Sequence, residues 1–393
     1  MHRSTDRILT THVGSLPRPD DLVAMMQEKQ AGRPVDRAAL AARVRGAVAE
    51  IVARQCDIGI DIVADGEMSK VGFIPYINDR LEGFAPSDRP QGGSYWGASR
   101  DARAFPDYYE WVAKQPGTAG NVGATRWSCC GPVAYKGAQE LATDIDNLTA
   151  ALAGRRHVEA FMPSISPTNV EDWDYNDHYP NDDDYLEAIA EALREEYHRI
   201  VEAGLLLQID DPALATNWLL YPDRDLPTVR AWAARRVEVL NHALRDIPKE
   251  KIRYHTCYSI NMGPRVHDME LKHIIDIMVR IKAGAFSFEA ANPRHEHEWT
   301  LWKDAGLPDD AVLIPGVITH STTLVEHPEL VAQRIERFAS VVGRERVIAG
   351  GDCGFASFAT SHEMHASIVW AKLAALVEGA EIASRHLWQK AAA

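Results

Sequence analysis

The stretch Ile252-Arg253-Tyr254-His255-Thr256-Cys257 predicts a short strand that ends in two metal-binding side chains. Side chains alternate along a strand, so His255 and Cys257 project from the same face and can reach one ion. Zinc takes four ligands in a tetrahedral arrangement, so the rest of the chain must supply two more. Cys353 and Glu289 are the candidates, because each closes another short apolar run. We therefore expect a zinc site formed by His255, Cys257, Glu289 and Cys353.

Runs of the same kind recur along the chain and define its expected fold. Counted from Ile60, the strand candidates are residues 60–65, 126–130, 157–163, 205–210, 252–257, 285–289, 312–318 and 347–352. Helical spacing of apolar residues is found at 20–30, 37–59, 136–154, 185–203, 226–245, 268–282 and 328–342. Strands that alternate with helices are typical of βαβ units and a parallel sheet. Eight such units favour an α/β fold of the (β/α)8 TIM barrel type, and an open doubly wound sheet is the alternative.

Two segments stand outside this alternation. The chain before residue 60, with a short strand-like entry at 8–17, is expected to be an N-terminal extension of the barrel. Residues 85–125 are rich in Gly, Pro, Trp and Tyr without periodicity, and we interpret them as a long insertion that covers a site. Neither a shift in composition nor an internal repeat divides the chain, so residues 1–393 are expected to form a single catalytic domain.

Polar residues stand where the apolar runs stop. In a barrel the carboxyl ends of the strands meet at one face, which carries the active site. One barrel mouth would therefore collect the following residues: Glu67, Asp210, His255, Cys257, Glu289 and Cys353. The segment His295-Glu296-His297-Glu298 is also rich in metal-binding types, but it follows an Asn-Pro pair. We expect it to be solvated or to face a substrate rather than to bind metal.

Composition limits the classes of partner. The chain has 393 residues, a net charge of −14, 46% hydrophobic and 25% charged residues. A strongly acidic protein is a poor partner for nucleic acid or an anionic membrane, so small molecules are the expected partners. No apolar run of membrane-spanning length and no signal-peptide core occur, which favours a cytoplasmic enzyme. The five cysteines are odd in number and widely spread, so they are available as thiolate ligands rather than as a disulfide framework.

The motifs resemble those of a known family. His255-Thr256-Cys257-Tyr258-Ser259, Phe288-Glu289 and Asp352-Cys353-Gly354 are similar to the zinc-binding motifs in the catalytic barrel of cobalamin-independent methionine synthase. Further counterparts, which extend the resemblance over nearly the whole chain, are Val13-Gly14-Ser15-Leu16-Pro17, Asp65-Gly66-Glu67, Gly131-Pro132-Val133, the run Gln-Ile-Asp-Asp-Pro-Ala at 208–213 and the run Gly-Val-Ile-Thr-His-Ser at 316–321.

The resemblance implies roles for individual residues. Ser15 would hold the carboxylate of an amino-acid substrate, and Glu67 and Asp210 would hold its amino group. His320 would act as the proton relay. A zinc-bound thiol loses its proton at neutral pH and becomes a nucleophile, and His320 would then protonate the leaving group.

The chain is too short to contain the second, N-terminal barrel that helps the synthase to hold its folate. It is similar to the short single-barrel relatives, which include methionine synthases with other methyl donors and the epoxyalkane:coenzyme M transferases. The expected function is zinc-dependent alkylation of a small-molecule thiol, with methyl transfer to homocysteine as the first choice. The donor would be a small molecule or a methyl-donor protein.

Two alternatives stay open. An enzyme that opens an epoxide with the thiolate of coenzyme M would need a cationic site for the sulfonate, for which Arg18, Arg126 and Arg294 are candidates. A protein of another class would bind zinc or a thiol without turnover.

Overall fold

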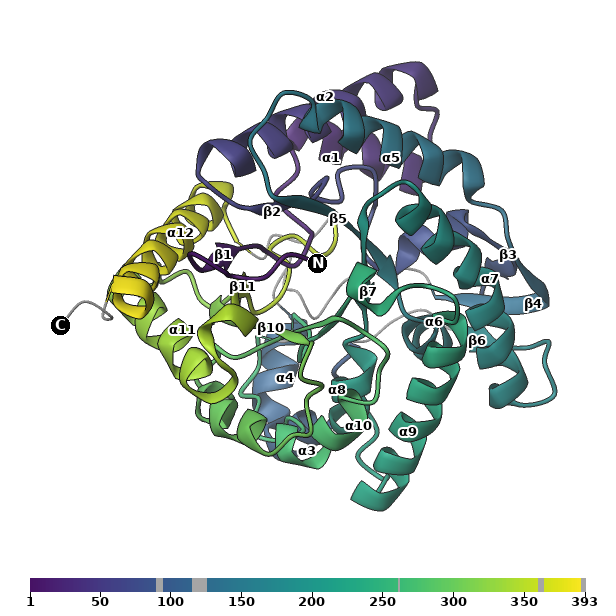
Figure 1. Cartoon of the computed structure of the whole chain (residues 1–393). Coiled ribbons are helices and arrows are strands. Elements are labelled where there is room, and N and C mark those ends of the chain that lie inside the picture. Colours follow the sequence, from purple (N-terminus) through teal and green to yellow (C-terminus); the bar gives the residue numbers. More distant parts are fainter. Residues whose placement is uncertain (90–94, 115–125, 261, 360–363, 390–393) are drawn as a thin grey trace.

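The computed structural model describes residues 1–89, 95–114, 126–260, 262–359 and 364–389. Its centre is a barrel of parallel strands surrounded by helices, seen along the barrel in Figure 1. Around the barrel the strands follow the order of the sequence: β1 (Leu9–Thr10), β2 (Ile62–Val63), β5 (Glu159–Ile165), β7 (Leu206–Asp210), β8 (Ile252–Thr256), β9 (Ala285–Phe288), β10 (Val312–Ile318) and β11 (Ile348–Gly351). A parallel bridge between Thr11 and Ile62 joins the first strand to the second. The prediction of a (β/α)8 barrel is confirmed.

Two of the strand assignments made from sequence are wrong. The first barrel strand is β1, which pairs with β11 through Leu9 and Ile348, so the N-terminal segment is part of the barrel. The run at 126–130 belongs to β4 (Trp127–Tyr135), which lies outside the barrel in a second sheet. β1 is only two residues long and cannot show a periodic pattern. β4 alternates between buried and more exposed positions, whereas the β7 and β8 strands of the barrel are buried throughout.

Helices connect the strands and cover the barrel. They are α1 (Asp20–Gln30), α2 (Arg37–Asp57), α5 (Ala138–Leu152), α6 (Pro167–Trp173), α7 (Asp182–Glu202), α8 (Ala213–Leu220), α9 (Leu226–Ala243), α10 (Ile275–Met278), α11 (Pro328–Val342) and α12 (Ala366–Gln389). Short 3₁₀ helices are η1 (Pro75–Asp79), η3 (Lys249–Lys251), η4 (Leu271–His273), η5 (Glu296–Lys303) and η6 (Arg344–Arg346). The helix predicted at 268–282 is replaced by η4 and α10.

Helix α7 shows how sequence sets such an element. Its N-cap Asn181 accepts a hydrogen bond from the backbone N–H of Asp184, and three aspartates fill the first turn, where the helix dipole favours negative charge. Leu186, Ile189 and Leu193 recur at helical spacing and are fully buried. The helix therefore packs its apolar side on the barrel.

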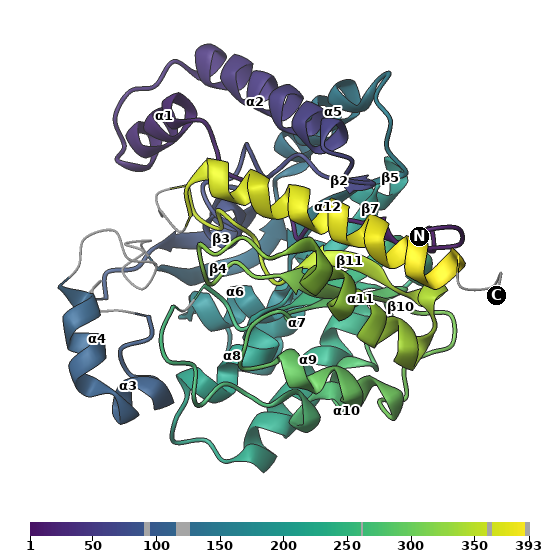
Figure 2. The ribbon, with the colours of Figure 1, turned by 90° about the vertical axis from the view of Figure 1, so that its left-hand side faces the viewer.

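Most of the second sheet and the whole insertion lie between β2 and α5 in the chain, and the last strand of this sheet follows α6. The sheet has the order β3 (Leu81–Pro86), β4 and β6 (Tyr175–Asn176). The described part of the insertion forms α3 (Arg100–Ala104) and α4 (Pro106–Ala113), whereas residues 90–94 and 115–125 lie outside the described residues. Figure 2 shows both helices at the end of the barrel opposite to the chain termini. Asp101 accepts hydrogen bonds from the backbone N–H of His267 at 3.1 Å and from its Nδ1 at 2.7 Å. The insertion is thus attached to the loop that follows β8.

The barrel interior is filled by side chains of alternate strand positions. One buried cluster consists of Leu9, Ile62, Ala64, Phe161, Leu206, Ala285, Val312, Ile314 and Ile348. Arg253 is also fully buried, with its guanidinium 3.9 Å from the centre of the Phe161 ring and hydrogen bonds to Thr11 Oγ1 and the His12 carbonyl. Burial lowers the pKa of Arg253 to about 9. These packed side chains fill the barrel interior beneath its mouth.

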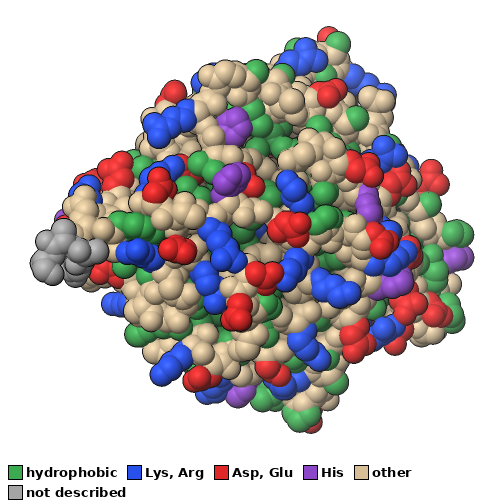
Figure 3. All heavy atoms as spheres, in the orientation of Figure 1, with side chains coloured by type: hydrophobic (Ala, Val, Ile, Leu, Met, Phe, Trp, Pro, Cys, Tyr) green, Lys and Arg blue, Asp and Glu red, His purple; other side chains and the backbone are tan. Residues whose placement is uncertain are grey.

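The surface carries both signs of charge. Figure 3 shows acidic and basic side chains interspersed over the face that carries the N-terminus. Within the described ranges, none of the helices combines the length and apolar composition needed to cross a membrane.

Candidate metal and substrate site

Three of the predicted metal ligands meet at the barrel mouth. His255 lies in β8, Cys257 directly follows it, and Cys353 follows β11. One ligand atom from each of them lies within 4.8 Å of the others, and all three side chains are buried. The two Sγ atoms are 3.2 Å apart, and both thiols are free of disulfides. The shared face of positions 255 and 257, inferred from strand geometry, therefore directs both side chains to the same point.

The imidazole of His255 is oriented as a metal ligand requires. Its Nδ1 is 3.0 Å from Ser287 Oγ on the neighbouring strand β9. Its Nε2 is buried and has no hydrogen-bond partner among the described residues. Burial lowers the pKa of His255 to about 3, so the ring is neutral at physiological pH. A neutral imidazole with one nitrogen hydrogen-bonded and the other free, next to two thiols, fits zinc.

Glu289 lies nearby but is bound differently. Its carboxylate accepts hydrogen bonds from the Nη1 and Nη2 atoms of Arg265, from the Tyr258 backbone N–H and from Asn292 Nδ2. Burial by itself would raise the pKa of Glu289, but the Arg265 guanidinium holds that pKa down to about 2. The structure does not group Glu289 with the two cysteines and His255, so its role as fourth ligand stays a prediction.

The predicted proton relay, His320, lies close to Glu289. One ligand atom each from His320, Glu289 and Asp352 fall within 4.8 Å of one another. Nε2 of His320 is 3.2 Å from the carbonyl oxygen of Ser259, which can only accept, so Nε2 carries a proton. Nδ1 is buried and has no partner among the described residues. Burial lowers the pKa of His320, which leaves Nδ1 unprotonated at neutral pH in this state.

One cavity at the carboxyl ends of the strands collects six of the eight predicted site residues. Its lining includes Ser15, Glu67, Asp210, His255, Cys257 and Cys353. Ser15 reaches the cavity because the β1 loop packs against the β11 loop. The backbone N–H of Phe355 donates to the Ser15 carbonyl, and a Cβ added to Gly354 would lie 2.0 Å from Ser15 Oγ. Glycine at 354 thus allows the two loops to approach.

Two carboxylates, those of Glu67 and Asp210, are part of the lining of this cavity. Glu67 adopts a left-handed conformation with φ of 58° after β2, and its Oε2 is buried without a partner among the described residues. Its Oε1 is 3.4 Å from Lys70 Nζ. Burial and the nearby charge of Glu67 raise the pKa of Asp210 well above its usual range. Two buried acids with a single lysine beside Glu67 favour a further cation, such as an ammonium group.

The three arginines considered for a sulfonate site are bound elsewhere. Arg18 donates to the carbonyl oxygens of Glu67 and Ala356. The backbone carbonyls of residues 172 and 173 accept from Arg126, and those of residues 265 and 266 accept from Arg294. No guanidinium of these three is part of the described lining of the cavity.

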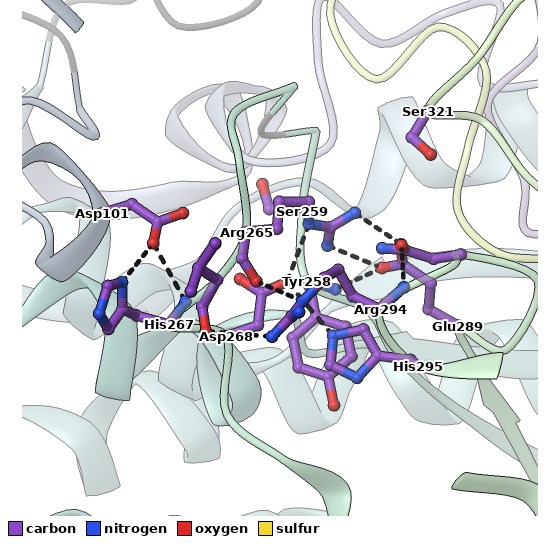
Figure 4. A network of polar contacts seen from close by, with 12 residues as sticks. Asp101, Tyr258, Ser259, Arg265, His267, Asp268, Glu289, Arg294, His295 and Ser321 are labelled. Carbon is purple, nitrogen blue, oxygen red and sulfur yellow. Dashed lines mark hydrogen bonds and ion pairs between the residues drawn. The ribbon is translucent and has the colours of Figure 1, made fainter. Parts of the chain in front are cut away.

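An ionic network that sequence reasoning missed lies beside the site (Figure 4). Arg265 Nε donates to Asp268, and His295 contacts both Asp268 and Glu298. From sequence, the segment 295–298 is expected to be solvated or to face a substrate. His295 is only 3% exposed and stacks on Tyr258 at 3.7 Å, so the solvated alternative is wrong for this residue, whereas His297 is exposed. Burial would lower its pKa, but hydrogen bonds with the two carboxylates raise the pKa to about 9. The i,i+3 spacing of Arg265 with Asp268 and of His295 with Glu298 was the available signal.

Comparison with known proteins assigns the chain to a family. The family model for the catalytic domain of cobalamin-independent synthase matches residues 8–100 and 166–380. The chain belongs to this family. The unmatched internal residues 101–165 include most of the insertion, together with β4, α5 and β5.

Individual family members support the assignment and the fold. A methionine synthase from Saccharolobus islandicus (strain L.S.2.15 / Lassen #1) is 24% identical, and the match covers 97% of this chain and 96% of that one. One from Thermococcus kodakarensis is 25% identical, with 96% and 94% covered. The structure of a B12-independent methionine synthase from Shewanella sp. W3-18-1 superimposes with a TM-score of 0.75 at 20% identity, over 98% of this chain and 99% of that one. The matches cover at least 94% of each of these proteins, so the three relatives are about as long as this chain.

Proposed function

We propose that the protein is a zinc-dependent methyltransferase that transfers a methyl group to the sulfur of homocysteine and so forms methionine. The observation that carries the proposal is the cavity whose lining combines His255, Cys257 and Cys353 with the acidic pair Glu67 and Asp210. The three metal-binding side chains suit a metal-bound thiol and the two carboxylates suit an ammonium group, and homocysteine carries both a thiol and an ammonium group. Membership in the family and the name methionine synthase carried by its relatives support the same reaction.

The three buried donors would hold the metal. Bound zinc would lower the pKa of the substrate thiol, so that the sulfur is present as a thiolate at neutral pH. The neutral His255 ring presents Nε2, and its contact with Ser287 fixes the direction of that lone pair. Cys257 and Cys353 supply two anionic sulfurs.

The acidic pair would bind and orient the amino acid. An ammonium group between Glu67 and Asp210 would relieve the repulsion that raises the pKa of Asp210. The Ser15 hydroxyl, on the neighbouring loop, would donate to the substrate carboxylate. Holding both groups fixes the position of the sulfur and removes most of its rotational freedom before the reaction.

The chemical step exchanges one bond for another. The thiolate electron pair forms the new S–CH3 bond as the bond between the methyl group and its donor breaks. The donor leaves with the electron pair of the broken bond and takes a proton. Nδ1 of His320, which is buried without a partner among the described residues, would pass that proton to the donor. Because burial lowers the pKa of His320, the ring would have to take up this proton in the substrate complex before the step.

The test measures metal and turnover together. Protein purified without added metal should hold about one zinc per chain, and the Cys353→Ser variant should hold far less. The wild-type protein should convert homocysteine to methionine with a reduced-folate or corrinoid methyl donor. The wild-type protein should methylate 4-mercaptobutyrate, a matched thiol that lacks the amino group, much more slowly than homocysteine. The Glu67→Gln variant should show a smaller difference in rate between the two thiols. Absence of zinc, or turnover of epoxypropane with coenzyme M in place of homocysteine methylation, would refute the proposal.

A further inference from the structure

The buried carboxylate of Glu67 has one oxygen engaged and one unpartnered. Oε1 lies 3.4 Å from Nζ of Lys70, and Oε2 is buried without a partner among the described residues. A buried acceptor that lacks a donor costs free energy and calls for a donor from a ligand, an ion or water. Because Glu67 is part of the lining of the substrate cavity, an ammonium group of the substrate can supply this donor.

The ammonium group of Lys70 is fixed from three sides. Nζ donates to the carbonyl oxygen of Pro163 in β5 at 2.7 Å, and it lies 4.2 Å from the centre of the Tyr76 ring in η1. The Tyr76 hydroxyl donates to Oε1 of Glu196 in α7 at 2.9 Å, which holds the ring in place. Nζ is therefore surrounded by a carbonyl oxygen, a ring face and the carboxylate of Glu67, and it has little freedom to leave them.

The charges around the acidic pair favour a fixed cation. Glu67 and Asp210 together carry −2 when both are ionised, and Lys70 reduces this charge to −1. One substrate ammonium group then makes the group of charges neutral. Without Lys70 the same complex would keep a net charge of −1 in a deeply buried place, which is costly. Two buried acids without a cation take up a proton and so lose the charge that attracts an ammonium group.

Lys70 belongs to the wall of a different cavity. It is part of the lining of a second cavity of about 680 Å³, together with Lys29, Tyr76 and Arg80. It is not part of the described lining of the substrate cavity, to which Glu67 belongs. Lys70 therefore acts on a substrate through Glu67 and does not touch it. Lys29 is exposed, so the second cavity is open to solvent and leaves room beside position 70.

We propose that Lys70 is a positioning residue that makes the site selective for thiols with one ammonium group. Its Nζ holds Oε1 of Glu67, so that the carboxylate stays ionised and Oε2 is kept for the substrate ammonium group. This inference rests on the proposed function and adds to it a residue that sets the substrate class. A lysine that merely competed with the substrate for Glu67 would have the opposite effect, because its removal would strengthen binding.

Homocysteine binding to the zinc-loaded protein, measured by isothermal titration calorimetry, tests the proposal without a methyl donor. The Lys70→Met variant should bind homocysteine about 10-fold or more weakly than wild type, because Glu67 loses the partner of Oε1. Its binding of 4-mercaptobutyrate, which lacks the amino group, should stay within about twofold of wild type. Lys70→Arg keeps the positive charge and should recover most of the loss. Lys29→Met is the matched control from the same cavity, since Lys29 pairs with Asp79 at 2.9 Å, and it should bind both thiols as wild type does.

A double-mutant cycle shows whether Lys70 acts through Glu67. In a Glu67→Gln background, Lys70→Met should change homocysteine binding by less than about twofold. This pair of variants leaves no unpaired carboxylate at position 67, so the comparison also decides the matter if Lys70→Met alone does not fold. A further loss of about 10-fold in the double variant would overturn the inference.

The remaining outcomes separate this inference from the function on which it rests. Unchanged or tighter homocysteine binding by Lys70→Met would overturn the inference alone. An equal loss for both thiols, or a Lys70→Arg variant as impaired as Lys70→Met, would do the same, because either result is expected from a purely structural role. A wild-type protein that binds homocysteine no better than 4-mercaptobutyrate would overturn the proposed function as well.

Discussion

The contact between Ser287 and His255 provides the sharpest test of the metal centre. Replacing Ser287 with alanine removes the hydroxyl that lies 3.0 Å from Nδ1 and leaves the rest of strand β9 in place. When Nε2 binds a metal, Nδ1 must carry the proton of the neutral ring and donate it to the Ser287 oxygen. The substitution therefore removes the hydrogen-bond acceptor of the Nδ1–H group, which must be present when the metal is bound. In the metal-free protein the proton can lie on Nε2 instead, so the loss costs less there.

The size of the effect follows from burial. Ser287 and His255 are 1% and 2% exposed, so water cannot replace the lost hydroxyl easily. A buried donor left without its acceptor costs about 1–3 kcal/mol. Loss of such a partner of a metal-bound histidine typically lowers metal affinity about 10- to 100-fold, which agrees with that range. We expect the Ser287→Ala variant to bind zinc weaker by this factor.

Chelator competition at fixed pH measures the affinity, and Ser164→Ala is the matched control. Ser164 is an equally buried serine on the barrel strand β5, but its hydroxyl donates to Glu196 rather than to a predicted metal ligand. The control should lower thermal stability and leave zinc affinity unchanged. Equal zinc affinities for wild type and Ser287→Ala would refute the assignment of His255 Nε2 as a ligand atom.

Three further predictions follow from the site and its surroundings. Gly354→Ala should raise the KM for homocysteine about 10-fold or more at unchanged zinc content, because the new Cβ would displace Ser15 Oγ; unchanged kinetics would remove Ser15 from the binding site. The pKa of His295 is raised to about 9 by Asp268 and its second carboxylate partner, so the stability contributed by the protonated ring is complete below pH 6.5 and is lost as the pH rises through 9. Denaturant titrations should show that the His295→Gln variant lacks this loss, which is on the order of 1–3 kcal/mol in wild type. Asp101→Ala should lower the free energy of unfolding by about 1–3 kcal/mol and speed proteolysis of the loop after β8, and an unchanged cleavage rate would contradict the anchoring role of the insertion.

The barrel could be predicted from the sequence because most of its strands and helices have a recognisable local pattern of apolar residues. The run at 205–210 is apolar enough for a strand buried on both faces, and the helices that precede and follow it show a clear helical period. The exceptions have a physical cause. Strand β1 forms because it pairs with β11, which lies near the other end of the sequence. It has only two residues, Leu9 and Thr10, so it cannot show a periodic pattern. The run at 126–130 has strand composition, but it pairs with β3 in an antiparallel arrangement outside the barrel.

The sequence by itself determined which chemistry the site offers. The spacing of His255 and Cys257 on one strand places both side chains on one face, and the rule that barrel strands end at a common mouth adds Cys353 and the acidic pair. Only the tertiary structure decided which groups are free to act. Glu289 ends its strand as a fourth ligand would, yet Arg265, which lies on a loop with no periodic signal, binds its carboxylate. Such pairing depends on side chains brought together by loops, whose conformations are set by contacts distant in the sequence.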